Sequence, residues 1–517
     1  MFDITYIGHA GWLIKNKDFK IICDPWFNPA GAFFSAWYPF PDNSRFLNKE
    51  LISDLDFVYI SHAHQDHCDP WTLNQIDKST PILIPKLKDR VLHNIIKSLD
   101  FANIIELEEN TEWIVNDIKI KLIIDERIIE TDSGLLLDDG VDKILNLNDC
   151  HAAFEKVRRF AGDVELLLVQ SSSAIWWPCV YNYDKIQMKN AGQLKRINSI
   201  NRGAEYAKQL NARFVVPNAG PPVFLSPEAK YWDNTRRENF NPFVLNDEVH
   251  QYFLENEISS LLVIPGSRLL LNHGMIEEIT DHEESKKIYN NLDTYLTHYR
   301  ERRRPHQMNL KAAPDELEKV IERFGSQIKR IKKHSKIFTK KVNFPFVVDF
   351  NEYGKWIIDF SKNSDECFLE YENGHYNYIF NFEPNLVALL FRNDFIDFED
   401  YFLSMRFKCD REVDQFNEFL FAIFKNFDLK RLAIAEISYL NEKPPDLDEN
   451  EMFELTCKEG RTLSVKRYCP HRQVDLKECG YLNENNELVC PLHGWKFNLQ
   501  NGHCVNNTEQ TSIFKTV

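Results

Sequence analysis

The feature that most constrains the fold of this chain lies near its C-terminal end, where two short segments each offer one cysteine and one histidine. The segments contain Cys469 with His471 and Cys490 with His493, and 18 residues separate His471 from Cys490. Two thiolates and two imidazoles form a complete set of four ligands for a metal centre. A small domain is therefore expected to fold around these four side chains.

A zinc site and a [2Fe-2S] cluster of the Rieske type can both use two cysteines and two histidines. Zinc fingers group a cysteine pair and then a histidine pair, whereas here each segment contributes one of each. The segments CPHRQVDL and CPLHGWKFNLQNGHC also resemble the two cluster-binding loops of the Rieske domains in ring-hydroxylating oxygenases. We therefore assign the four ligands to a Rieske [2Fe-2S] cluster and leave Cys479 and Cys504 as ordinary thiols.

A second group of metal-binding residue types follows the predicted strand DFVYI. The segment SHAHQDHCD holds His62, His64, Asp66 and His67. Three histidines and an aspartate within six residues can gather imidazoles and a carboxylate around one or two divalent ions. The sequence therefore predicts a metal site at the end of this strand.

This segment matches the H-x-H-x-D-H signature and so resembles the metallo-β-lactamase superfamily, as do the preceding segments GHAGWLI and DPW. The resemblance implies an αββα sandwich with the metals at one edge of its sheets. It also implies that Asp66 and His67 bind one metal and the first two histidines the other. Asp149 matches the bridging aspartate of that superfamily, and a helix N-cap is the alternative role for it. Asp66 and Asp149 are thus the expected catalytic carboxylates.

The chain departs from that superfamily where further histidines are expected. The stretch IIDERIIETDSG has only acids, so Asp125, Glu130 or Asp132 is the candidate replacement. The strand end VVPNAGPPVFLSPE also lacks a histidine, which leaves His151 and His273 as candidates. Hydrolytic members use a full histidine set around two zinc ions, whereas histidine with carboxylate and open positions is typical of non-haem iron oxygenases.

A Rieske module and a metallo-β-lactamase domain in one chain resemble the CMP-N-acetylneuraminate hydroxylase family, which has its Rieske module first rather than last. The segments CDPWFNPAGAFFSAWYP, YISHAHQDH and ILNLNDC look like counterparts of that family's segments. The resemblance implies an oxidoreductase of monooxygenase type, in which the cluster feeds electrons to one or two non-haem iron ions and O2 oxidises a C–H or N–H bond. A zinc hydrolase with a redox-regulatory Rieske domain and a pure electron-transfer protein remain the alternatives.

The charge and patterning of the chain limit its partners. A formal net charge of -16 disfavours binding to nucleic acid or an anionic membrane, so a small-molecule substrate is expected. The N-terminal segment alternates like a strand and lacks the pattern of a signal peptide, which indicates a cytoplasmic protein. No GxGxxG fingerprint occurs, so the electrons should come from an external reductase or carrier of the ferredoxin, flavodoxin or cytochrome type. The sequence is also compatible with a homo-oligomer.

Three domains are predicted: an α/β metal-binding catalytic domain over 1–280, a helical and α+β middle region over 281–445, and a small all-β Rieske domain over 452–517. Helices are expected over 191–211 and 412–427, and a linker over 441–451. His9 is expected in a structural or supporting role. The basic run YRERRRPH (299–306) is either a solvated helical face or a docking patch for an acidic electron donor or an anionic substrate.

Overall fold

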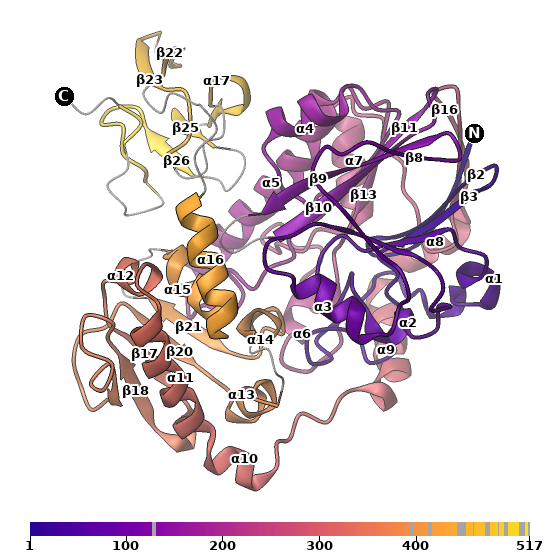
Figure 1. Cartoon of the computed structure of the whole chain (residues 1–517). Helices are drawn as coiled ribbons and strands as arrows, with labels where there is room; N and C mark the ends of the chain where they lie inside the picture. Colours follow the sequence, from indigo (N-terminus) through magenta and orange to yellow (C-terminus); the bar gives the residue numbers. More distant parts are fainter. Residues whose placement is uncertain are drawn as a thin grey trace. The chain divides into compact units, whose positions relative to one another are not determined.

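The computed structural model of this 517-residue chain describes residues 1–126, 131–392, 397–411, 416–441, 451–458, 460–470, 476–483, 485–490, 495–505 and 512–514. The chain divides into two compact units (Figure 1). The first comprises Met1–Ala152, Lys156–Trp176 and Lys189–Asn309, and the second comprises Ala153–Glu155, Trp177–Met188 and Leu310–Val517. Among the described helices, none is long and apolar enough to cross a membrane.

Eight of the described strands form the first sheet of the first unit, in the order β16-β15-β1-β2-β3-β5-β6-β7. They are β1 (Phe2–Gly8), β2 (Gly11–Asn16), β3 (Phe19–Cys23), β5 (Phe57–Tyr59), β6 (Ile82–Pro85), β7 (Ile104–Leu107), β15 (Arg268–Asn272) and β16 (Met275–Ile279). The neighbours from β3 to β7 are parallel. Their carboxyl ends therefore meet at one edge of the sheet.

Six further described strands form the second sheet, in the order β13-β12-β11-β10-β9-β8. They are β8 (Trp113–Val115), β9 (Ile118–Glu126), β10 (Thr131–Asp138), β11 (Lys143–Asn148), β12 (Leu166–Gln170) and β13 (Phe214–Asn218). The strands β11, β12 and β13 are parallel. All five residues of β12 are buried, which is typical of a parallel strand covered on both faces.

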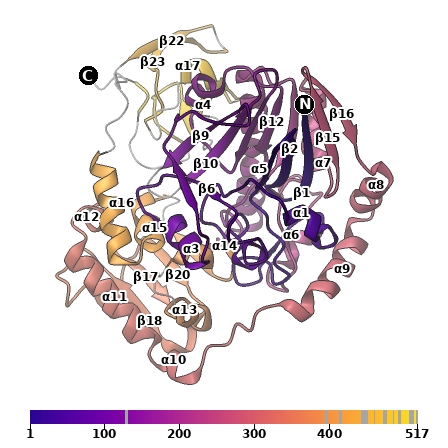
Figure 2. The same cartoon turned by 45° about the vertical axis from the view of Figure 1, so that its right-hand side comes forward.

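The two sheets pack face to face around one apolar core. Alternate side chains of β1 and β2 meet alternate side chains of β9, β10 and β12 there, among them Ile4, Tyr6, Trp12, Ile120, Leu135 and Leu168. On the other face of the first sheet, a second cluster joins β5 and β6 to α2 (Pro70–Leu73) and α3 (Val91–Ser98). Figure 2 shows helices α4 (Phe154–Ala161), α5 (Lys185–Gln209) and α7 (Asn246–Glu255) beside the second sheet. The predicted αββα sandwich is confirmed, and α5 confirms the helix predicted over 191–211.

Shorter elements surround the two sheets of the first unit. They are β4 (Trp37–Tyr38), α1 (Lys49–Ile52), β14 (Val223–Phe224), α6 (Lys230–Asn234), α8 (His282–Asn290), α9 (Leu292–Arg303) and the 3-10 helix η2 (Arg304–His306). The two-residue strands β4 and β14 pair with each other. Because α8 and α9 belong to the first unit, that unit extends beyond residue 280. The bounds of the three predicted domains remain a prediction from the sequence.

Five described strands of the second unit form a mixed sheet in the order β19-β18-β17-β20-β21. They are β17 (Phe346–Asp349), β18 (Lys355–Ile358), β19 (Phe368–Glu370), β20 (Tyr378–Asn381) and β21 (Lys408–Arg411). The helices of this region are α10 (Pro314–Glu318), α11 (Val320–His334), α12 (Phe338–Lys341), α13 (Pro384–Leu390), α14 (Phe398–Leu403), α15 (Glu418–Lys425) and α16 (Leu429–Asn441). Helix α15 lies within the helix predicted over 412–427, of which residues 412–415 are outside the described residues.

Phenylalanine builds the core of this region, which explains much of its high content in the chain. The Phe324 ring of α11 contacts five other phenylalanine rings at centroid distances of 5.2 to 6.4 Å, those of Phe350, Phe368, Phe382, Phe398 and Phe427. Edge-to-face and stacked rings pack densely at such distances. The aromatic residues of this region therefore serve packing.

The last part of the chain is built from short strands. A hairpin of β22 (Met452–Thr456) and β23 (Thr462–Lys466) is followed by α17 (Leu476–Cys479) and by a small sheet of β24 (Tyr481–Leu482), β25 (Glu487–Val489) and β26 (Lys496–Asn498). This is the predicted small β-rich Rieske domain. Most of the linker predicted over 441–451 lies outside the described residues.

Candidate metal centre

The loop after β5 places the predicted H-x-H-x-D-H residues at the carboxyl edge of the first sheet. His62, Asp66 and His67 are at most 2% exposed, while His64 is partly exposed. The loop ends at Asp69, whose carboxylate caps the first turn of α2. Strand and helix thus hold both ends of the loop and keep its ligand-type side chains inside the protein.

His67 is oriented so that one ring nitrogen points into the site. Its Nδ1 donates to Asp24 Oδ2 at 2.9 Å. Its Nε2 is buried without a hydrogen-bond partner and lies 3.6 Å from Asp149 Oδ1 and 3.9 Å from Asp66 Oδ2. Since Asp24 takes the proton of Nδ1, the lone pair of Nε2 is available between two carboxylates, as in histidines that bind metals.

Two overlapping groups of potential ligands share His67. One consists of His9, Asp66 and His67, and the other of His62, His67 and Asp149, with one ligand atom per residue and all such atoms within 4.8 Å of one another. His9 follows β1 and its Nε2 lies 2.9 Å from Asp66 Oδ2. His9 therefore sits at the site itself, in contact with one of the predicted ligands.

His62 is held through both ring nitrogens. Its Nδ1 lies 3.0 Å from Ser61 Oγ and 3.3 Å from Asp132 Oδ1, and its Nε2 lies 2.8 Å from His64 Nδ1. Ser61 in turn donates through its hydroxyl to Asp24 Oδ2 at 2.6 Å. Asp24 therefore supports both histidine positions, directly at His67 and through Ser61 at His62.

The candidate replacements for the missing histidines lie at different places. Asp132 of β10 contacts His62 at its Nδ1, on the side away from His64, and so supports this histidine. Asp125 is buried and faces Asp132 across the β9–β10 pair. Glu130 lies outside the described residues. His273 is exposed in the turn between β15 and β16, and the structure does not bring it to the cluster.

Asp149 follows β11 and is held by a buried glutamine. Gln170, the last residue of β12, donates through Nε2 to Asp149 Oδ1 at 2.7 Å and to the Ala219 carbonyl at 3.2 Å. The Oε1 of Gln170 accepts from Arg202 Nη2 at 3.3 Å and lies 3.0 Å from His151 Nε2. Gln170 thus uses both ends of its amide, and His151 contacts Gln170 rather than either ligand group.

The electrostatics of the site favour a cation. Burial alone would raise the pKa of Asp66, but the charge of His67 and the hydrogen bond with His9 lower it to about 2. Burial would lower the pKa of His67, yet the charges of Asp149 and Asp66 raise it well above its ordinary value. A buried pair of carboxylates that attracts a proton this strongly also attracts a metal ion.

A strained turn covers His64. Phe33, Phe34 and Ser35 have φ angles of 51°, 57° and 59°, a left-handed conformation that non-glycine residues rarely adopt in succession. The Phe33 N–H donates to Gln65 Oε1 at 2.8 Å, and its ring lies edge-on to His64 with centroids 6.1 Å apart. The turn therefore places an apolar ring directly against a predicted ligand.

The described cysteines of the Rieske motif lie in one core. Cys469 follows β23 and Cys490 follows β25, and both are at most 1% exposed within the same apolar cluster. His471 and His493 lie outside the described residues. Two buried thiols in one apolar cluster suit a [2Fe-2S] cluster that needs two sulfur ligands shielded from water.

Two functional residues were not predicted from the sequence, Asp24 and Gln170. Each comes at or directly after the end of a parallel strand, as do the histidine loop and Asp149. Polar residues at successive carboxyl ends of parallel strands share one edge of a sheet, and this rule could have identified both.

Three domain profiles match the chain. The profile of the beta-lactamase superfamily domain matches residues 3–128, the Rv3818-like, SCP2-like domain matches 320–441, and the Rieske [2Fe-2S] domain matches 432–516. The fold and site thus define a metallo-β-lactamase-fold protein with a buried His/Asp metal site and a Rieske [2Fe-2S] domain.

A protein of Mycolicibacterium smegmatis that is named as a putative Rieske 2Fe-2S iron-sulfur protein is 30% identical to this chain over 527 residues. The match covers 97% of this chain and 98% of that protein. The chain belongs to the same family. Cytidine monophosphate-N-acetylneuraminic acid hydroxylase of Mus musculus is 26% identical over 303 residues, covering 56% of this chain and 51% of that protein. The crystal structure of CmlA, a diiron beta-hydroxylase from Streptomyces venezuelae, is similar at 16% identity and a TM-score of 0.35, covering 52% of this chain and 54% of that chain.

Proposed function

We propose that this protein is a Rieske-dependent non-haem iron oxygenase, a hydroxylase or N-oxygenase that acts on a small molecule. Support comes from the joint presence of the Rieske domain and the buried His/Asp site in one chain. A Rieske cluster transfers single electrons and has a task only where a second redox centre accepts them. The mouse relative is a hydroxylase, which agrees with this assignment.

The residues at the site fit a metal ion. The buried Nε2 of His67 has no hydrogen-bond partner and faces two carboxylates, which would be costly without a cation between them. The residues that we expect to hold the metal are His62, His64, Asp66, His67 and Asp149. When bound there, iron would supply the redox chemistry of oxygen activation, with electrons from the cluster held by Cys469, His471, Cys490 and His493.

The observation that favours iron over zinc as the bound metal is the set of residue types at the carboxyl edge of the sheets. Where β12 and β13 end, the chain supplies the amides of Gln170 and Asn218 instead of histidines, and Asp132 stands beside His62. Histidine together with carboxylate and open positions is the ligand style of non-haem iron oxygenases. The full histidine set that suits a pair of zinc ions is absent from the described ends of these two strands.

Neighbouring residues would set the geometry of the site. Asp24 keeps the proton of His67 on Nδ1, so that Nε2 stays a ligand. Gln170 holds Asp149 toward His67, and the Phe33 ring limits the access of water to His64. Asp66 and Asp149, the two carboxylates on either side of His67, are the proposed catalytic groups. The electron donor would be a separate reductase or carrier.

Metal analysis tests the proposal. Anaerobically purified protein should contain more iron than the [2Fe-2S] cluster accounts for, and His64→Ala should lose the excess while the visible and EPR spectra of the cluster stay unchanged. Exposed His282 provides the matched control, since His282→Ala should keep both metals. Active protein with only two irons per chain would defeat the proposal.

A second candidate is a metal hydrolase with a redox-regulatory Rieske domain, favoured by the beta-lactamase superfamily profile over residues 3–128. It requires zinc at the His/Asp site and hydrolysis of esters or phosphodiesters without oxygen. The two candidates are separated by assaying the anaerobic protein with zinc and with iron. Substrate-dependent oxygen consumption by the iron form would exclude the hydrolase.

A further inference from the structure

The basic run at 299–306 is divided by the structure into two parts with different surroundings. Arg302 and Arg303 both donate to the carboxylate of Asp42, each at 2.9 Å, and so serve to attach α9 to the first unit. Arg300 and Arg304 instead line a groove beside α6. Arg300 and Arg304 are therefore the arginines that a ligand in this groove would meet.

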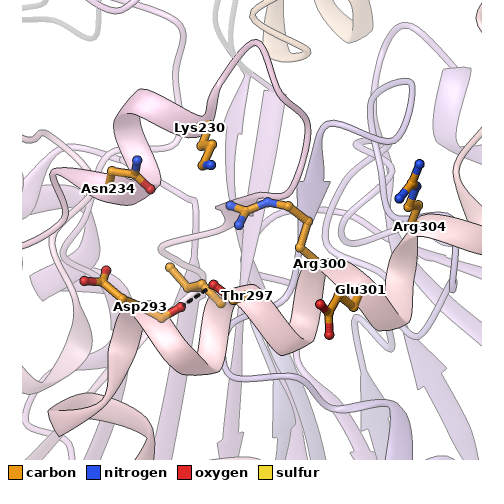
Figure 3. A pocket seen from close by; sticks show the side chains of 8 residues that line it. Lys230, Asn234, Asp293, Thr297, Arg300, Glu301 and Arg304 are labelled. Atoms are coloured by element: carbon orange, nitrogen blue, oxygen red, sulfur yellow. Dashed lines mark hydrogen bonds between the residues drawn. The ribbon is translucent and has the colours of Figure 1, made fainter.

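The groove lies between α6 on one side and α9 with η2 on the other (Figure 3). Its volume is 570 Å³, within the range of about 300 to 1,000 Å³ that small-molecule sites occupy. It is lined by Lys230, Asn234, Asp293, Leu296, Thr297, Arg300, Glu301 and Arg304. Leu296 is the buried apolar residue of this lining, and the charged side chains surround it.

Arg300 shares its carboxylate partner with a second arginine. Its Nη2 donates to Asp233 Oδ2 at 3.3 Å, but the same fully buried carboxylate also accepts from Arg236 Nη2 at 2.9 Å. One carboxylate thus accepts from two guanidinium groups. The Nε of Arg300 is moreover buried without a hydrogen-bond partner. Arg300 is therefore oriented by Asp233 while its Nε donor remains unused.

Lys230 adds a second cation opposite Arg300. Figure 3 shows the ammonium of Lys230 and the guanidinium of Arg300 pointing toward one another across the groove. Two like charges at such a position repel each other, and an anion between them would turn the repulsion into two attractions. Asp293 and Glu301 lie on the α9 side, where their carboxylates can accept hydrogen bonds from hydroxyl groups but not from a second anionic group.

We propose that this groove binds a small organic phosphate, with the phosphate group between Lys230 and Arg300. A phosphate monoester carries nearly two negative charges and matches two facing cations better than a single carboxylate does. The hydroxyl groups of its organic part would contact Asp293 and Glu301, and its carbon skeleton would pack on Leu296. A large acidic protein surface fits less well because these two carboxylates interrupt the positive charge.

Calorimetric titration of the full chain tests this site with three probes, glucose 6-phosphate, inorganic phosphate and glucose. We expect saturable binding of glucose 6-phosphate to one site per chain, weaker binding of inorganic phosphate, and none of glucose. Lys230→Gln should weaken the binding of glucose 6-phosphate about tenfold or more, because one of two phosphate contacts is lost. Lys287→Gln, which removes an exposed lysine of α8 outside the groove, should leave it unchanged.

Three outcomes would overturn the proposal. They are the absence of saturable binding by glucose 6-phosphate, equal affinity in the Lys230→Gln and Lys287→Gln variants, and binding of glucose as tight as that of its phosphate. If inorganic phosphate bound as tightly as glucose 6-phosphate, the proposed contacts between the groove and the organic part of the ligand would be wrong. Raising the salt concentration should weaken the binding of both anions, since these cations are partly solvent-exposed.

Discussion

The two metal-binding regions of this chain are assembled in opposite ways. The four predicted Rieske ligands come from two short segments between residues 469 and 493. The residues of the His/Asp site instead lie at the ends of β1, β3, β5, β11 and β12. In the sequence they are spread from residue 9 to residue 170. A local site depends on its own ligands, whereas a site collected from many strands depends equally on the residues that hold those ligands in place. Substitutions should therefore affect the two regions differently.

The largest effect is expected at a cluster ligand. Cys490→Ser should abolish the absorption and EPR signals of the Rieske cluster, because a [2Fe-2S] cluster with one ligand missing is not retained. The metal that we propose for the His/Asp site should remain, since its expected ligands come from another unit. Cys504→Ser, at a buried cysteine outside the ligand pattern, is the matched control and should keep the cluster. Loss of both metals in Cys490→Ser would show that the two regions are not independent.

At the His/Asp site, a residue that binds no metal should matter almost as much as a ligand. Asp24→Asn keeps the shape of the side chain but weakens its hydrogen bonds with His67 and Ser61. We expect metal affinity to fall roughly 10- to 100-fold, the usual effect of losing such a supporting carboxylate. Competition with a chromophoric chelator measures the affinity. An unchanged affinity would contradict the role assigned to Asp24.

A smaller loss is expected at Gln170. Gln170→Ala frees Asp149 from its 2.7 Å hydrogen bond and should reduce metal affinity about tenfold. The visible spectrum of the cobalt-substituted site should also change, because Asp149 would reorient. Gln187→Ala, at an exposed glutamine, serves as the control. If the cobalt spectrum of Gln170→Ala equals that of the wild type, Gln170 does not position this ligand.

The smallest effect should appear in the acid stability of the metal-free protein. The pKa of Asp66 falls from 3.8 to about 2 on folding, so the unfolded carboxyl takes up its proton at a higher pH than the folded one. This contribution to stability is present above the unfolded pKa and is lost as the pH falls from 3.8 toward 2. Thermal unfolding of chelator-treated wild type and Asp66→Asn should converge over this interval. A constant difference between their Tm values would contradict the shifted pKa.

The same contrast explains what the sequence could and could not predict. Cys469, His471, Cys490 and His493 lie close together in the sequence, so the Rieske cluster could be assigned without knowledge of the three-dimensional structure. The metallo-β-lactamase-like motif identified the fold, and through the fold it pointed to Asp149, which lies beside His67 at 3.6 Å. Asp24 and Gln170 carry no motif of their own. Their roles depend on which strands are neighbours, and strand order is a property of the folded sheet.

The sequence could not show which of the remaining histidines reaches the metal site, for a related reason. His9, expected only in a supporting role, contacts Asp66, whereas His151 contacts Gln170 and His273 stays at the surface. Imidazole is equally able to bind a metal in all three positions. The direction in which each loop leaves its strand decides which ring reaches the site, and residue type does not encode that direction.

The left-handed turn at Phe33–Ser35 has a consequence for mutational tolerance. Each of its residues holds a conformation that costs an L-amino acid about 1 to 2 kcal/mol, and the ring of Phe33 lies against the predicted ligand His64. In a library that samples every amino acid at Phe34, the partly exposed residue of this turn, glycine and asparagine should preserve the fold best, and valine and isoleucine should be least accepted. The pattern of accepted residues in this turn would thus report the backbone shape that the metal site requires, and not the chemistry of the side chains.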